Sequence, residues 1–259
     1  NIILYSNKDQ KVMTAFKRST ISLDDVIIGD KSSLGSAFKW PGTTDMNWLK
    51  DKRLYIIAGC ELSYFSEYLK QSGIDIHHTF ENHSAMDPYT ELNDPLSLLW
   101  EYNPDYIILS QIQIIRTLIT KHERSRGDWG REEQIEAIDS VVSALEWSIN
   151  RIRKDINCPI WLLTHIGTHT PAHGMHDYRG VENSMGIYEF LLNYKLKLYD
   201  LARKFSSAYI IDVDLALEST GKWPEGKPPM IRPYETLGGH PESKGAQVLA
   251  EYFHHQLLI

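Results

Sequence analysis

The sequence predicts an α/β protein, a three-layer α/β/α sandwich with a five-stranded parallel sheet at its centre. Short apolar runs alternate five times along the chain with longer amphipathic segments. Crossover connections of that length are typical of parallel strands, which cannot be joined by tight turns. The apolar runs are continuous, which indicates strands that are buried on both faces. Helices are therefore expected to cover both sides of the sheet.

The first strand, helix and second strand follow one another within about thirty residues. The runs at 54–59 and 74–80 are apolar enough to be buried strands. Between them, 61–73 carries apolar side chains at helical spacing and ends at Gly73, a residue that favours helix termination. This unit predicts two parallel strands joined by a crossover helix.

The middle of the chain continues the pattern. Asp94 and Pro95 suit the N-cap and the first position of a helix, so we expect a short helix that runs to Trp100. The third strand is expected at 105–114. The longest helix is expected at 131–155, where apolar residues recur every three or four positions.

The last third of the chain supplies two more strands. They are expected at 158–166 and 208–214, with a helix at 188–206 between them. A closing helix is expected at 241–258. Residues 1–50 fit the alternation less well, so we expect an N-terminal extension packed on the α/β domain of residues 51–259.

Composition excludes several classes of protein. The 259 residues are 42% hydrophobic and 24% charged, which is ordinary for a globular chain and not for a disordered or fibrous one. The net charge of -7 argues against a nucleic-acid partner, because phosphate binding needs clustered Lys and Arg. No stretch of about 18 apolar residues exists, so no membrane partner is expected. Two cysteines, Cys60 and Cys158, are too few for a disulfide framework and indicate the reducing cytoplasm.

Polar residues suited to acyl transfer follow several predicted strands. Three segments end predicted strands: Ala58-Gly59-Cys60-Glu61, Ser110-Gln111-Ile112-Gln113 and Thr164-His165. A fourth, Gly238-Gly239-His240-Pro241, precedes the closing helix. Ligands of parallel sheets bind beyond the carboxyl ends of the strands, where these segments are expected to lie. A thiol or hydroxyl, amide donors and a histidine are the parts of an acyl-transfer site.

The segment GGHPESKGAQVLAEYF resembles the last sequence block of the SGNH/GDSL hydrolase superfamily. The resemblance covers roughly residues 54–258 and implies the same α/β/α fold, with His240 as the general base. The first block of that superfamily is Gly-Asp-Ser, with Ser as nucleophile. In one register Cys60 takes the Ser position; in the other Glu61 takes it, and Ser63 is then the nearest hydroxyl.

The chain departs from the superfamily pattern at two further positions. The Asp expected three residues before the base is Leu237, and Glu235 is the nearest substitute. The Gly-x-Asn-Asp block has no clean match, although Gln113 could supply the amide donor that Asn usually gives. Without a full triad, the resemblance implies slow hydrolysis or acyl transfer rather than a fast esterase.

Two subgroups of the superfamily are closer in pattern. Capsule-type acetyltransferases have a similar Gly-(Asn/Ser)-Cys start. The N-terminal domain of HAD-type IIIC proteins, which load glyceryl units onto carrier proteins, is similar to DPLSLLWEYNPDYIIL and IIDVDLALESTGK. The expected partners are therefore a small acyl donor or ester and a carrier protein or adjoining domain. The alternative function is a catalytically degenerate domain that docks a carrier protein or substrate for a partner enzyme.

The remaining candidate residues are assigned to substrate or oxyanion binding. The backbone amides after Gly59 and the side chains of Gln111, Gln113, His165 and Arg124 are expected there. Glu61 is expected to be an acid in the first turn of a helix, where the helix dipole favours it, or else to orient the base. The four histidines within 165–176 lack the spacing of a zinc site, so no metal and no cofactor is expected.

Overall fold

A five-stranded parallel sheet forms the centre of the protein. The computed structural model describes residues 49–82, 86–115, 117–118, 129–164, 187–218 and 243–257. The strands are β1 (Arg53–Ile57), β2 (Asp75–His78), β3 (Tyr106–Leu109), β4 (Ile160–Thr164) and β5 (Ala208–Asp212). They are arranged in the order β2-β1-β3-β4-β5, and every neighbouring pair is parallel. This confirms the predicted fold class and the presence of all five predicted strands. The third is shorter than predicted, because it ends at Leu109 and residues 112–115 are helical.

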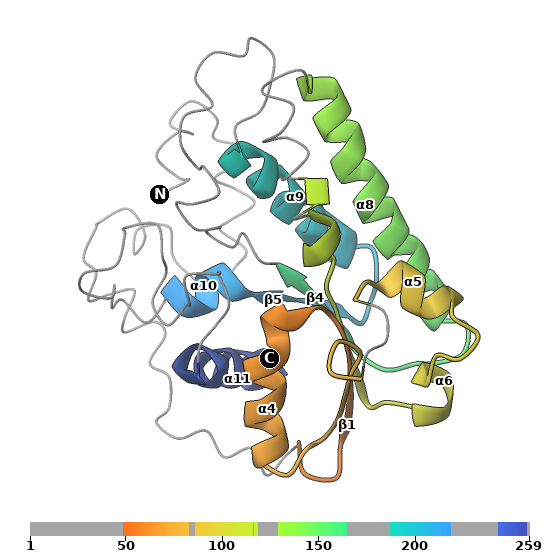
Figure 1. The fold of residues 1–259 in the computed structure, drawn as a ribbon, viewed down its shortest axis with the longest axis vertical. Coiled ribbons are helices and arrows are strands. Elements are labelled where there is room, and N and C mark those ends of the chain that lie inside the picture. The colour runs from red at the N-terminus through yellow and green to blue at the C-terminus, as the bar shows by residue number, and fades with distance from the viewer. Residues whose placement is uncertain are drawn as a thin grey trace.

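Helices cover both faces of the sheet (Figure 1). One turn of 3-10 helix, η3 (Cys60–Leu62), leads directly into α4. The α-helices are α4 (Ser63–Gln71), α5 (Pro88–Asn93), α6 (Leu99–Tyr102), α8 (Arg131–Ile152), α9 (Ile187–Ala202), α10 (Val213–Glu218) and α11 (Ser243–Leu257). The pair α4 and α11 packs together on one face, and α8 and α9 pack together on the other.

Alternate residues of the central strands enter opposite hydrophobic cores. In β1, Leu54 and Ile56 join the core beneath α4, α10 and α11, whereas Tyr55 and Ile57 join the core beneath α8 and α9. All four side chains are fully buried. Successive side chains of a strand point to opposite faces, so a continuous apolar run is what a doubly covered strand requires.

The prediction of a short helix that begins at Asp94 and Pro95 is wrong. The Asp94 carboxylate accepts a hydrogen bond from the backbone amide of Leu96 at 2.8 Å, which makes a turn, and α6 begins only at Leu99. The N-cap and proline pair is used instead at Asp87, which caps α5. The physical reason is that Asp94 already ends α5 as its C-cap, with its backbone amide donating to the carbonyls of Thr90 and Glu91. Leu96, in the turn that follows, is 83% exposed.

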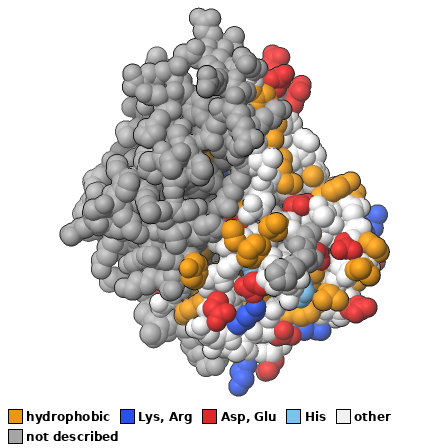
Figure 2. Space-filling model, in the orientation of Figure 1, with side chains coloured by type: hydrophobic (Ala, Val, Ile, Leu, Met, Phe, Trp, Pro, Cys, Tyr) orange, Lys and Arg blue, Asp and Glu red, His pale blue; other side chains and the backbone are white. Residues whose placement is uncertain are grey.

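The described surface carries scattered hydrophobic side chains between charged ones, as the right-hand side of Figure 2 shows. Tyr89 of α5 and Trp147 of α8 are exposed and lie with their rings 5.0 Å apart. Isolated exposed hydrophobic residues are normal and indicate no particular partner. Within the described ranges, no helix combines the length and apolar character needed to span a membrane. The expected N-terminal extension falls almost wholly outside these ranges.

Candidate functional site

The candidate site lies where the strand order reverses. β1 is flanked by β2, which follows it in the chain, and by β3, which is reached by a second crossover on its other side. In open parallel sheets, ligands bind beyond the carboxyl ends of the strands at such a switch point. The residues that follow β1 and β3 therefore define the site, and these are the segments from Gly59 to Ser63 and from Ser110 to Gln113.

The turn after β1 presents one accessible thiol. Cys60 is partly exposed and begins η3, immediately before α4. It forms no disulfide with Cys158, the other cysteine of the chain. Cys158 is buried, and burial raises the pKa of its thiol to about 11. Cys60 is therefore the more accessible of the two thiols.

The carboxylate of Glu61 joins the ends of the two strands. Glu61 is only 2% exposed. Its Oε1 accepts hydrogen bonds from the Gly59 backbone amide at 3.2 Å and from Ser110 Oγ at 2.7 Å, and its Oε2 accepts one from Gln113 Nε2 at 3.3 Å. Glu61 does lie in the first turn, as expected, but its side chain is turned inward to hold β1 and β3 together.

Gly59 allows this close packing because it has no side chain. A Cβ at position 59 would lie 2.2 Å from Gln113 Nε2 and 2.7 Å from Glu61 Oε2. Real Cβ atoms do not approach other heavy atoms so closely, so both side chains would have to move. The φ of Gly59 is -86°, which any residue adopts, so the requirement for glycine is steric and not conformational.

We expect Gly59→Ala to lower the free energy of unfolding by about 1–3 kcal/mol, as overpacking of a filled site does. The cost should fall when Gln113 is also replaced by alanine, because the nearest clashing atom is then gone. Urea denaturation of both single variants and the double variant measures this coupling. An equal cost of Gly59→Ala in both backgrounds would contradict the packing described for Gln113.

Several buried polar atoms around Glu61 have no hydrogen-bond partner among the described residues. They are both carboxamide atoms of Gln111, Oγ of Ser63 and the hydroxyl of Tyr194 in α9. Burial and the nearby charge of Glu61 raise the pKa of Tyr194 well above its usual value. Buried polar groups are usually hydrogen-bonded, so these four atoms are unusual. Other such atoms in the described residues are His78 Nδ1, the Tyr102 hydroxyl and Trp161 Nε1.

Two tyrosines of α9 offer a matched test of this burial. Tyr199 donates its hydroxyl to Asp212 Oδ2 at 2.6 Å, whereas the Tyr194 hydroxyl has no partner in the described chain. We expect Tyr199→Phe to lower the free energy of unfolding by about 1–3 kcal/mol, because the buried Asp212 loses a donor. Tyr194→Phe should raise it by up to about 1 kcal/mol, because a costly buried hydroxyl is removed. Thermal unfolding of both variants measures these changes. Equal losses of stability in the two variants would contradict the conclusion that only the Tyr199 hydroxyl has a buried partner among the described residues.

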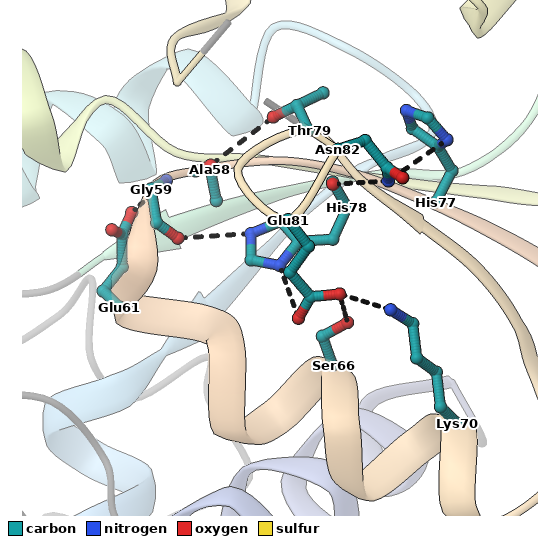
Figure 3. A network of polar contacts seen from close by, with 10 residues as sticks. All are labelled: Ala58, Gly59, Glu61, Ser66, Lys70, His77, His78, Thr79, Glu81 and Asn82. Carbon is teal, nitrogen blue, oxygen red and sulfur yellow. Dashed lines mark hydrogen bonds and ion pairs between the residues drawn. The ribbon is translucent and has the colours of Figure 1, made fainter. Parts of the chain in front are cut away.

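The end of β2 supports the turn from the other side (Figure 3). His78 is fully buried, and its Nε2 lies 3.2 Å from the carbonyl oxygen of Gly59. Its Nδ1 lies 3.3 Å from Glu81 Oε1. Burial favours a higher pKa for Glu81, but the hydrogen bonds from Lys70 and His78 outweigh it and hold the pKa below its usual value. Glu81 is therefore a carboxylate at neutral pH.

The structure brings five of the predicted site residues to one sheet edge, namely Gly59, Cys60, Glu61, Gln111 and Gln113, with Ser63 at the start of α4. Gln113 is not at a strand end but in the helical segment 112–115. His240, His165 and Arg124 lie outside the described residues; α11 begins three residues after His240. Within the described residues, no group of three or more Cys, His, Asp or Glu side chains is arranged to hold a metal ion.

Three features of the site were not predicted from the sequence. They are the hydrogen bond from Ser110 to Glu61, the buried Tyr194 hydroxyl and the contribution of β2. The signal for β2 was present, because His78 and Thr79 end a predicted strand just as Cys60 follows one. Tyr194 gave no signal, since its position on α9 is that of an ordinary core aromatic residue.

The fold is similar to that of a lipase of known structure. A lipase from a goat rumen metagenome, Lip_vut3, superposes with a TM-score of 0.50 at 13% sequence identity, over 78% of this chain and 94% of the lipase. A family 3 carbohydrate esterase of Clostridium thermocellum is less similar, with a TM-score of 0.43 at 10% identity, over 79% of this chain and 94% of the esterase. No family model matches the sequence, and no curated protein matches it at a significant level. At these identities the likeness to the lipase establishes the α/β/α fold and no more.

Proposed function

We propose that the protein transfers an acyl group, or hydrolyses an ester, through a covalent acyl-enzyme. The observation that carries the proposal is the position of Cys60, a partly exposed thiol at the carboxyl end of β1 and at the switch point of the sheet. It begins the helical turn that leads into α4, so the first backbone amides of that turn lie next to the thiol in the chain. Ser63, one turn later, is the second candidate nucleophile.

The proposed reaction has two steps. In the first, His240 takes the proton of the Cys60 thiol while Sγ attacks the acyl carbon, so that a C–S bond forms and an oxyanion develops. The C–O or C–S bond to the leaving group then breaks, and the leaving atom takes the proton from His240. In the second step, water or an acceptor hydroxyl or amine attacks the thioester, and Cys60 recovers its proton.

The proposed oxyanion donors are the backbone amides of residues 60 and 61, with Gln113 as a side-chain donor. In this structure the Gln113 amide donates to the Glu61 carboxylate. Gln113 could therefore donate to the oxyanion only after its side chain moves away from Glu61. Gln111, His165 and Arg124 are proposed to bind substrate. The buried carboxamide of Gln111, with no partner among the described residues, supports its part of this assignment.

Transfer is favoured over hydrolysis for two chemical reasons. A thioester keeps the acyl group reactive toward an acceptor, and Leu237 stands where a triad aspartate would orient the base. The proposed substrate is a small acyl donor or ester. The proposed location is the cytoplasm, where a catalytic thiol stays reduced.

The contacts of Glu61 favour one second candidate. Its carboxylate already accepts hydrogen bonds from Gly59 and Gln113, which leaves fewer donors for an oxyanion. This fits a degenerate domain that docks a carrier protein, an adjoining domain or a substrate for a partner enzyme. No covalent acyl-enzyme would form on such a domain.

Intact-mass spectrometry separates the two functions. The wild-type protein is incubated with p-nitrophenyl acetate, acetyl-CoA and an acetyl-loaded carrier protein, then digested for peptide mapping. Acyl transfer predicts a mass gain of one acetyl group from at least one donor, located on Cys60. The absence of any adduct and of any turnover would overturn acyl transfer in favour of docking.

A further inference from the structure

We propose that His78 is a positioning residue that orients the backbone amide of Cys60, one of the oxyanion donors of the proposed reaction. This inference rests on the proposed acyl transfer. His78 belongs to β2 and is a neighbour of Cys60 in space only, and it takes no part in the chemistry itself. Its effect is transmitted through one peptide group, the one that joins Gly59 to Cys60.

Two side chains continue the pairing of β1 with β2 after the strands have ended. The last residues paired in register are Ile56 and His78, and the Thr79 amide donates to the Ile56 carbonyl at 3.0 Å. Beyond that point, Thr79 Oγ1 donates to the Ala58 carbonyl at 3.4 Å and His78 Nε2 donates to the Gly59 carbonyl at 3.2 Å. Figure 3 shows these two contacts side by side. The path of β1 is thereby fixed as far as the residue before Cys60.

The imidazole of His78 is itself held in place. A carbonyl oxygen only accepts hydrogen bonds, so Nε2 carries the proton that faces Gly59. On the other side of the ring, Nδ1 faces Glu81 at 3.3 Å. Glu81 accepts hydrogen bonds from Lys70 and, at 3.4 Å, from Ser66, both in α4. The same network thus anchors the ring to the helix that follows Cys60 (Figure 3).

The geometry of the peptide bond carries the effect to Cys60. The described peptide bonds are all trans, so the N–H of Cys60 points opposite to the C=O of Gly59 in one rigid plane. Fixing that carbonyl therefore fixes the direction of the amide. The preceding peptide group is held as well, because the N–H of Gly59 donates to Glu61 at 3.2 Å. The Gly59–Cys60 plane therefore turns only if the buried hydrogen bond from His78 to the Gly59 carbonyl is broken. A donor bound at the carbonyl also polarises the peptide group and strengthens its N–H as a donor.

Three variants separate positioning from packing. His78→Leu keeps the approximate volume and removes the donor. His78→Gln restores an N–H donor near the position of Nε2. Thr79→Val is the matched control, because it also removes a buried side-chain donor from the end of β2, but one that binds Ala58 and not the peptide group of Cys60. Circular dichroism and thermal unfolding establish that each variant is folded.

Two reactions of each folded variant are then compared. Acylation by p-nitrophenyl acetate passes through an oxyanion, whereas alkylation of Cys60 by iodoacetamide forms none. We expect His78→Leu to slow acylation by about 10- to 100-fold, somewhat less than the loss of a whole oxyanion donor. Alkylation of Cys60, followed by peptide mapping, should change little. His78→Gln should recover most of the acylation rate, and Thr79→Val should nearly retain it.

Each outcome is decisive. Parallel losses of acylation and alkylation in His78→Leu would overturn the proposal, because they indicate a general disturbance of the turn. Unchanged acylation in a folded His78→Leu variant would overturn it too, while leaving acyl transfer intact. A wild-type protein that alkylates but never acylates would overturn the proposed function and the role of His78 with it.

Discussion

Cys60→Ala is expected to abolish the acyl adduct and to reduce turnover by about 10⁴-fold or more, as removal of a nucleophile does in enzymes that act through a covalent intermediate. Alanine has no nucleophilic atom, and the turn from Gly59 into α4 otherwise stays intact because the hydrogen bonds of Glu61 involve no atom of the Cys60 side chain. Intact-mass spectrometry after incubation with the donor that labels the wild type measures the adduct.

Two control variants make this result specific. Cys158→Ser should keep the adduct, because that thiol is buried and its pKa of about 11 leaves little thiolate at neutral pH. Ser63→Ala should keep it as well if Cys60 is the nucleophile. An adduct that survives in Cys60→Ala and disappears in Ser63→Ala would move the nucleophile to Ser63, whose Oγ is buried at the start of α4.

The sheet could be predicted from the sequence because strand burial leaves a direct trace in it. A strand covered on both faces is expected to be a nearly continuous apolar run, as β4 is in its first four residues, and all five residues of Ile160–Thr164 are buried. Helix boundaries were less predictable, since two Asp-Pro pairs offer the same capping chemistry. Only tertiary packing decides between them, and it favours the pair at Asp87, whose helix α5 packs against α8.

The candidate site could be predicted only in part. Topology brings the carboxyl ends of β1 and β3 together, so Gly59, Cys60 and Gln113 were expected to be neighbours. The inward rotamer of Glu61 could not be predicted, because it depends on Ser110 being within hydrogen-bonding distance across two strands. The contacts from β2 to the turn could not be predicted either, because they depend on the direction of the His78 side chain.

Glu61→Ala is expected to lower the free energy of unfolding by about 2–4 kcal/mol, the other large effect at this site. The substitution removes the acceptor of three hydrogen bonds and leaves the buried donors of Gly59, Ser110 and Gln113 to be satisfied in other ways. Glu61→Gln should cost less, because its carbonyl oxygen can still accept from Gly59 and Ser110. Urea denaturation at neutral pH gives the free energies of unfolding of the wild type, Glu61→Ala and Glu61→Gln.

The matched control is Glu67→Ala in α4. Glu67 is exposed and its carboxylate accepts a hydrogen bond from Gln71 at 2.9 Å, so its loss should change the free energy of unfolding by no more than about 0.5 kcal/mol. Equal losses for Glu61→Ala and Glu67→Ala would show that the inward carboxylate adds no stability. In that case the turn before Cys60 would be held from the β2 side alone, by His78 and Thr79, and the loss of acylation in His78→Leu should then be at the upper end of its expected range.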